Sequence, residues 1–405
     1  MTDHTFSDRV SHAKQTFFST FKTEPLIISQ APGRAEIIGN HTDYNNGYAL
    51  SAGINRKTIT LLGKREDRFV HVYSTTFSKE PSIFSLDQIE KGAHGDWLNY
   101  IKGVIGELMK VSNTITGMNI LIDSDVPSSG GVSSSAALEL SLSTGILALL
   151  GVEMDAVEKS HMCQKAENGS LVEVPCGFLD QASSGLTKKD HLLFLDFLPS
   201  HDMPVSELRQ IPVDLTKHNM SFVVIVDKEV KRNLGTSGYP ARRAQCERSV
   251  PILAEMLERE LKSLRDVTVS DFESKRIELE KIDPEMRKRV EHIVYENQRV
   301  LDAVEALEKG EIERFGAILT ASGKSALELY ELDAQTPELT KLVTEGRNIE
   351  GVVGMRNMGG GFSAIALALV RNERMESFKK ELDSAYGPGL EYLPFTPADG
   401  AGVAK

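Results

Sequence analysis

The chain has 405 residues, 40% of them hydrophobic and 26% charged, which is typical of a globular protein with about two or three domains. Its 58 acidic and 46 basic residues leave a formal charge of −12, which argues against general binding to nucleic acid or to an anionic membrane. Three scattered cysteines without a CxxC pair, a polar amino terminus and the lack of a membrane-length apolar stretch predict a cytoplasmic enzyme without a zinc site.

Strands are predicted in the first part of the chain, after a polar and helix-like lead-in over residues 1–24. Runs rich in Val, Ile and Thr, punctuated by Gly and Pro, are LIISQAPG, KTITLLGKRE, RFVHVYSTTF and GMNILIDSDVP. Apolar residues at helical spacing predict a helix in WLNYIKGVIGELMK and a second one from Ser133 to Leu150.

The second part of the chain is predicted to be richer in helix. Two strand-like runs, HLLFLDF and SFVVIVD, are separated by a stretch that we interpret as a linker or a loop. Residues 240–350 are charged and helix-periodic, and a glycine turn, a strand, one more helix and a tail follow. Because the predicted strands lie mainly in the first part of the chain and the helices in the second, the sequence predicts an α+β protein.

A loop of small residues, VPSSGG, precedes the helix that begins at Ser133. Glycines allow close approach of the backbone, the first amides of a helix lack internal partners, and hydroxyls can donate to phosphate or bind a metal. These features suit a polyphosphate, although a plain Gly/Ser turn with a serine N-cap explains the same residues. The loop does not match the Walker A pattern.

Two further segments are ambiguous when taken alone. Residues 31–47, APGRAEIIGNHTDYNNG, concentrate polar side chains between small residues and fit either a hydrogen-bonded turn or a ligand site. Glycines 359–361 fit a tight turn before the strand FSAIALALV.

Together, and in this order, PGRAEIIGNHTDYNNG, VPSSGGVSSSAAL and MRNMGGGFSAIALALV resemble the three signature motifs of the GHMP small-molecule kinases, and most of all those of the galactokinase family. The first family motif reads roughly G-R-x-N-x-I-G-E-H-x-D-Y. DWLNYIKGV, the stretch from KAEN to CGFLDQ, SGYPARRAQCE, YENQRVLDA and TPADGAG also resemble galactokinase segments. The resemblance spans nearly the whole chain.

The resemblance implies a two-lobed α+β GHMP kinase fold. Residues 1–210 would form a lobe like the second domain of ribosomal protein S5, and residues 211–405 a ferredoxin-like lobe. The implied activity is Mg²⁺-dependent transfer of the ATP γ-phosphate to the anomeric (C1) hydroxyl of galactose or a close galacto-configured sugar. We expect a monomer, with a weak homodimer as the alternative.

The resemblance also assigns roles to residues. Asp180 would be the catalytic carboxylate, acting as a base or only orienting the hydroxyl, and Arg34 would stabilise the transferred phosphoryl group. Ser135 and Glu167 would bind Mg²⁺. The triphosphate would be lined by Ser129, Gly130, Gly131, Val132, Ser133, Ser134 and Ser135. The sugar would be contacted by Asn40, His41, Thr42, Asp43 and Tyr239.

The first motif departs from the family at two positions. Glu36 stands where the family has Asn, and Asn40 stands where it has Glu. One reading is compensation, in which Glu36 reaches the same sugar atoms and galactose stays the substrate. The other reading is a 1-kinase for galacturonate, N-acetylgalactosamine or arabinose. Without the acidic residue at position 40, galactose would lose one charge-assisted hydrogen bond, which costs about 1.5–3 kcal/mol of binding free energy.

A third reading is a galactose sensor that binds ATP and sugar but turns over poorly. The complete Ser133–Ala136 run, together with Arg34, Glu167 and Asp180, argues against it.

Overall fold

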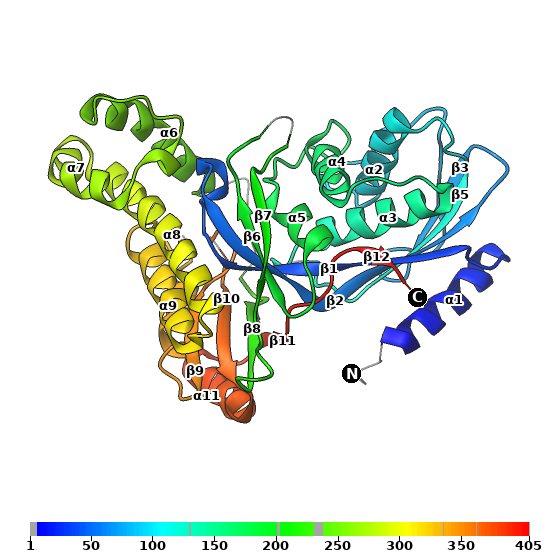
Figure 1. Cartoon of the computed structure of the whole chain (residues 1–405). Helices are drawn as coiled ribbons and strands as arrows, with labels where there is room; N and C mark the ends of the chain where they lie inside the picture. The colour runs from blue at the N-terminus through cyan, green and yellow to red at the C-terminus, as the bar shows by residue number, and fades with distance from the viewer. Residues whose placement is uncertain are drawn as a thin grey trace.

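The computed structural model describes residues 6–128, 131–200, 203–230, 238–334, 336–361 and 363–404. They form an α+β structure with two β-sheets, and helices cover the sheets (Figure 1). The predicted class is therefore confirmed.

Within these residues the first sheet has eight strands, in the order β12-β1-β2-β5-β3-β4, with β6 beside β2 and β7 beside β6. Its pairs are antiparallel except for β3 with β5. The bounds are β1 Ile27–Ile38, β2 Tyr48–Lys64, β3 Phe69–Ser74, β4 Ser82–Ser85, β5 Met118–Ser124, β6 His191–Asp196, β7 Glu207–Pro212 and β12 Gly402–Val403.

Among the described residues, five helices belong to this part of the fold. In Figure 1, α2 to α5 lie on one side of the long strands β1 and β2, and α1 lies on the other. Helix α3 packs against β1 and β2 and is apolar over most of its surface, as expected of a helix enclosed on all sides. The bounds are α1 Phe6–Phe21, α2 Leu98–Val111, α3 Ser134–Leu150, α4 Ala156–Asn168 and α5 Leu179–Leu186.

The second sheet is antiparallel, in the order β11-β8-β10-β9. Its strands are β8 Met220–Asp227, β9 Val352–Asn357, β10 Ile365–Arg371 and β11 Leu390–Phe395. The helices of this part are α6 Tyr239–Met256, α7 Val269–Ile282, α8 Pro284–Glu308, α9 Ile312–Glu328, α10 Pro337–Gly346 and α11 Met375–Tyr386. Short 3₁₀ turns are η1 Asp43–Asn45, η3 Leu264–Asp266 and η4 Asn372–Arg374.

Two interpretations of the sequence were wrong. The stretch taken as a linker or loop contains β7, and the predicted tail contains β11 and β12. All three strands have weak local patterns, and β11 and β12 pair with strands that are distant in sequence.

One apolar core joins the two sheets. It contains Ile37 and Leu50 of the first sheet, Val224 and Leu367 of the second, and Val300 of α8. The boundary predicted at residue 210 falls within β7, and β12 pairs with β1, so the chain enters the first sheet again at its end. The division into 1–210 and 211–405 remains a prediction.

The helices were also compared with the requirements of a membrane span. None of those within the described residues is both long enough and apolar enough to cross a bilayer.

Candidate active site

Strand β1 brings Arg34 against the loop that precedes α3. The register of β1 with β2 shifts between Pro32 and Arg34, and the Arg34 N–H donates to the Val132 carbonyl at 2.9 Å instead of to the sheet. A Cβ atom on Gly33 would lie 2.7 Å from that carbonyl oxygen, so only glycine allows this approach.

The Asp180 carboxylate is held through both of its oxygens. Arg34 Nε donates to Oδ1 at 2.8 Å, and Ser133 Oγ donates to Oδ2 at 2.5 Å. Arg34 Nη1 also donates to the Gly131 carbonyl at 2.5 Å. The Asp180 side chain is 29% exposed and that of Arg34 is 9% exposed. One edge of the carboxylate thus faces solvent beside a fixed guanidinium.

Ser133 shows how the loop differs from a simple capped turn. It occupies the N-cap position of α3 in a left-handed conformation, with φ 54°, and its side chain makes no capping hydrogen bond. The hydroxyl is directed to Asp180 instead. Ser133 is therefore the N-cap residue of α3, but its side chain does not cap the helix.

The rest of the predicted phosphate loop surrounds Ser133. Gly131 has φ 61°, and a Cβ atom there would lie 2.6 Å from Ile365 Cδ1 of β10. Val132 is buried, and Ser134 and Ser135 are half-buried at the start of α3. Ser129 and Gly130 lie outside the described residues.

Glu167 of α4 is buried next to the catalytic candidate and is not a solvated acid. Gln181 Nε2 donates to Glu167 Oε2 at 2.6 Å and to Glu139 Oε2 at 3.0 Å. Burial and the nearby charge of Asp180 raise the pKa of Glu167 to about 7, although a hydrogen bond from Ser135 opposes this shift.

Sequence reasoning missed Glu139. Burial, and then the charge of Glu167, raise the pKa of Glu139 well above its usual value. Glu139 follows Ser135 by four residues on α3, a spacing that places both on one helix face and was available as a signal. Among the described residues there is no group of three or more His, Cys, Asp or Glu side chains that could hold a metal ion.

The β1–β2 loop, residues 39–47, holds most of the predicted sugar contacts. The Asn40 side chain is fully buried: its Nδ2 donates to Glu36 Oε1 at 3.1 Å and to the Gly359 carbonyl at 2.6 Å, and its Oδ1 accepts from Asn357 Nδ2 at 3.2 Å. Glu36 Oε1 also pairs with buried Arg356 at 3.2 Å. The two positions that depart from the family motif therefore contact each other.

Sequence reasoning did not single out Arg356 and Asn357. Both lie in the third quoted motif, at the end of β9, and Met358 separates them from the glycine turn. The sequence did contain a signal for them, because two polar side chains at the end of a mostly apolar strand need buried partners or a ligand.

His41 and Tyr239 belong to a ring cluster beside this network. His41 has φ 61°, and its Nδ1 lies 2.9 Å from the Tyr44 hydroxyl while Nε2 lies 3.2 Å from the Gly360 carbonyl. Burial lowers the pKa of His41 to about 3, so its ring is neutral at physiological pH. Tyr239 begins α6, and its ring centroid lies 5.3 Å from that of His41.

Asp43 and Thr42 complete the loop. Thr42 Oγ1 lies 2.7 Å from the Gly39 carbonyl and 2.6 Å from the Tyr48 carbonyl, so its one donor is used within the loop. Burial raises the pKa of Asp43 to about 6, and a Cβ atom on Gly177 would lie 2.6 Å from Asp43 Oδ2. Asp43 thus reaches the turn that leads into α5 and Asp180.

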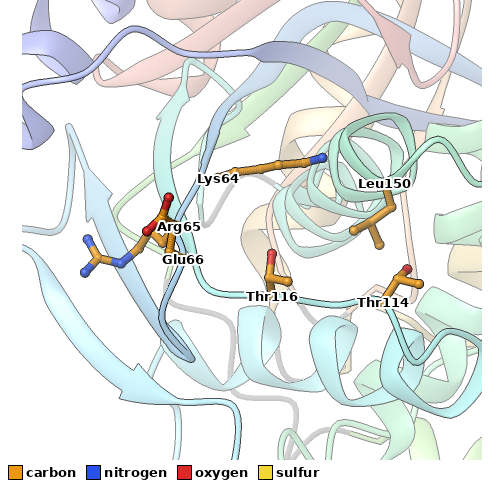
Figure 2. A pocket seen from close by; sticks show the side chains of 6 residues that line it. All are labelled: Lys64, Arg65, Glu66, Thr114, Thr116 and Leu150. Carbon is orange, nitrogen blue, oxygen red and sulfur yellow. The ribbon is translucent and has the colours of Figure 1, made fainter.

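A cavity of about 490 Å³ lies elsewhere, lined by Lys64, Arg65, Glu66, Thr114, Thr116 and Leu150. Figure 2 shows the Lys64 side chain extending toward Leu150, whereas Arg65 points away. This cavity is far from the candidate site. Gly53 of β2 pairs with Arg34, and Lys64 at the end of β2 is eleven residues further along the strand, or about 35 Å of extended chain. This cavity contains none of the predicted site residues.

Two family models match the chain. Residues 15–64 match the galactokinase galactose-binding signature, and residues 99–188 match the amino-terminal domain of GHMP kinases. A mevalonate kinase structure has a TM-score of 0.65 at 15% identity, covering 92% of this chain and all of that one, which shows the shared fold. The fold and the site define a GHMP kinase.

Relatives that match over nearly their whole length identify the family within the GHMP kinases. The galactokinase of Clostridium tetani is 32% identical over 95% of this chain and 94% of its own length, and that of Mannheimia succiniciproducens is 35% identical over 92% and 93%. The structure of Lactococcus lactis galactokinase complexed with galactose has a TM-score of 0.86 at 30% identity, covering 97% of this chain and 99% of that one. The chain belongs to the galactokinase family.

Proposed function

We propose that this protein is an ATP-dependent galactose 1-kinase of the cytoplasm, active as a monomer. The observation that carries the proposal is the arrangement of Arg34, Ser133 and Asp180 at the start of α3, beside the loop that matches the galactose-binding signature. Helix N-termini attract phosphate, and the partly exposed Asp180 carboxylate can receive a sugar hydroxyl.

Phosphoryl transfer depends mainly on alignment and on stabilisation of charge. Arg34 lies against both Asp180 and the Gly131 carbonyl, so its guanidinium is fixed between the proposed acceptor site and the phosphate loop. Asp180 would orient the C1 hydroxyl and accept its proton. Ser133 would then exchange its bond to Asp180 for one to the triphosphate, because the serine and the sugar hydroxyl compete for the same carboxylate.

The residues present fit a magnesium ion. The Ser135 hydroxyl hydrogen-bonds to the Glu167 carboxylate, and a hydroxyl with one carboxylate is a usual protein contribution to Mg²⁺ when phosphates and water supply the rest. When bound there, the ion would neutralise charge on the triphosphate. Gln181 keeps Glu167 directed to this position.

The contacts of Glu36 favour galactose over the alternative sugars. Arg356 is fully buried and needs a carboxylate, and Glu36 supplies it while also accepting from Asn40. One negative charge is thus kept beside Arg356 although the family's Asn and Glu have changed places. This retained charge supports galactose as the substrate, but Glu36 Oε1 is already engaged by Arg356 and Asn40, so the direct contact with the sugar that the compensatory reading requires stays a prediction.

The function is tested by measuring phosphate transfer from ATP to galactose, galacturonate, N-acetylgalactosamine and arabinose. We expect galactose to give the highest kcat/KM and sugar 1-phosphate as the product. Sugar binding without turnover would instead identify a sensor, and a higher kcat/KM for another sugar would identify that sugar as the substrate.

Replacement of Glu167 by Gln tests the metal assignment. Because the pKa of Glu167 is raised in the folded protein, its ionisation lowers the free energy of unfolding. This loss is absent below the ordinary pKa of 4.5 and reaches its full size above about pH 7. We therefore expect that, without metal, Glu167→Gln melts at a higher temperature than the wild type at pH 8, and at nearly the same temperature as the wild type at pH 4. Mg²⁺-dependent turnover should fall about 100-fold. An unchanged Mg²⁺ requirement would remove Glu167 from the metal site.

A further inference from the structure

Helix α8 contacts the β1–β2 loop from the carboxyl-terminal half of the chain. Its segment YENQRVLDA resembles the galactokinase family, yet the proposed function gives it no task. Three of its side chains, those of His292, Glu296 and Asn297, form hydrogen bonds with the backbone of residues 39–48.

The loop backbone needs such partners. Gly39 has φ 109° and His41 has φ 61°, so the chain leaves the regular ladder of β1 at this point. Residues 39–42 are buried, and a buried N–H without an acceptor is costly. Glu296 Oε1 accepts the N–H of Gly39 at 3.1 Å and that of Asn40 at 3.3 Å.

Glu296 is itself fixed on both sides and fully buried. Oε1 also accepts from Ser322 Oγ at 2.6 Å, and Oε2 accepts from Arg299 Nε at 2.7 Å. Burial opposes ionisation, but the nearby charges of Arg299 and Arg356, and the Ser322 hydrogen bond, hold the pKa of Glu296 well below its usual value. Its bonds to the loop are therefore charge-assisted and stronger than neutral ones.

The neighbours of Glu296 on α8 bind the loop on either side. His292 Nε2 lies 3.3 Å from the Asn40 carbonyl, and Asn297 Oδ1 accepts the Tyr48 N–H at 3.1 Å where β2 begins. The loop is thus held at both ends by one helix.

We propose that Glu296 is a positioning residue for sugar binding: its carboxylate fixes the backbone of Gly39 and Asn40 so that His41 and Asp43 of the same loop present their side chains to the substrate. This inference rests on the proposed function, because it assigns the β1–β2 loop to the sugar. Glu296 touches neither the phosphate loop nor Asp180 in any hydrogen bond of the described residues.

The test compares Glu296→Gln with Glu291→Gln. Both exchanges remove one carboxylate from α8, but Glu291 pairs with Arg276 and Arg287 and not with the loop. For Glu296→Gln we expect the galactose KM, and the galactose Kd from calorimetry, to rise about tenfold, because a neutral amide is the weaker acceptor. The ATP KM should stay within about twofold, and Glu291→Gln should change neither constant.

Asn297→Ala provides a second variant in case Glu296→Gln does not fold. It removes the acceptor of the Tyr48 N–H and should raise the galactose KM about threefold, again without an effect on ATP. A lower melting temperature with an unchanged galactose KM, or an equal rise in both KM values, would overturn the proposal.

Wild-type turnover is measured first, so that the two proposals can fail separately. If the wild type phosphorylates another sugar of the panel, the proposed substrate is wrong, and the same variants are measured with that sugar. A rise in the KM for that sugar, without a rise in the KM for ATP, would support the positioning role of Glu296, and no such rise would contradict it.

Discussion

Asp180→Asn is expected to lower kcat about 1,000-fold while leaving the affinity for ATP nearly unchanged. The carboxylate accepts from Arg34 through one oxygen and from Ser133 through the other. An asparagine must direct its NH₂ group at one of these donors, and it cannot take a proton from the sugar. Loss of a general base costs about 10²- to 10⁴-fold in rate. Steady-state kinetics measure kcat, and calorimetry with ATP in the absence of sugar measures the affinity for ATP.

Asp125→Asn is the matched control for this variant. Asp125 also pairs with an arginine, Arg9, and its side chain is 27% exposed against 29% for Asp180. We expect near-normal kcat from the control. Near-normal kcat from Asp180→Asn as well would show that Asp180 is not the catalytic carboxylate.

Single substitutions at residues 36 and 40 should produce the largest effects on sugar recognition. In Asn40→Glu a second buried carboxylate would face Glu36 and the Gly359 carbonyl, both of which now accept from the Asn40 amide. In Glu36→Asn, buried Arg356 would lose its partner. Breaking a buried pair of this kind costs about 3–5 kcal/mol, so each single variant should be destabilised and lose more than about 100-fold in kcat/KM for galactose.

The double variant Glu36→Asn/Asn40→Glu should recover part of both losses, because residues 36 and 40 contact each other and the network would again hold one carboxylate and one amide donor. Urea unfolding of the wild type, both single variants and the double variant forms a double-mutant cycle, with an expected coupling of about 2–3 kcal/mol. Asn348→Glu, the same exchange at an exposed residue, controls for added charge. Faster galactose turnover by Asn40→Glu alone would contradict the compensatory reading and indicate a natural substrate that differs at C6.

Local sequence was informative where one element supplies its own signal. The apolar run after Ser133 predicted α3, and runs rich in Val, Ile and Thr between Gly and Pro predicted β1, β2 and β5, because these preferences are carried by consecutive residues. The ordered motifs also grouped Arg34, Ser135, Glu167 and Asp180 as site candidates.

The partners of these residues needed the folded chain. Glu139 and Gln181 meet through a side-chain hydrogen bond between α3 and α5, and Glu296 reaches Asn40 across more than 250 positions. The strand β7 was missed because its pattern is weak and its pairing with β6 decides its structure.

The sequence by itself determined the kinase family, the order of the main elements and the side chains available for chemistry, because these depend on residue type and short-range spacing. Only the tertiary structure decided that Glu36, and not Asn40, pairs with Arg356, that Ser133 bonds to Asp180 and caps no helix, and that α8 holds the β1–β2 loop. Each of these contacts joins buried or partly buried polar groups from distant segments, and the loss of water obliges such groups to find partners that no local pattern specifies.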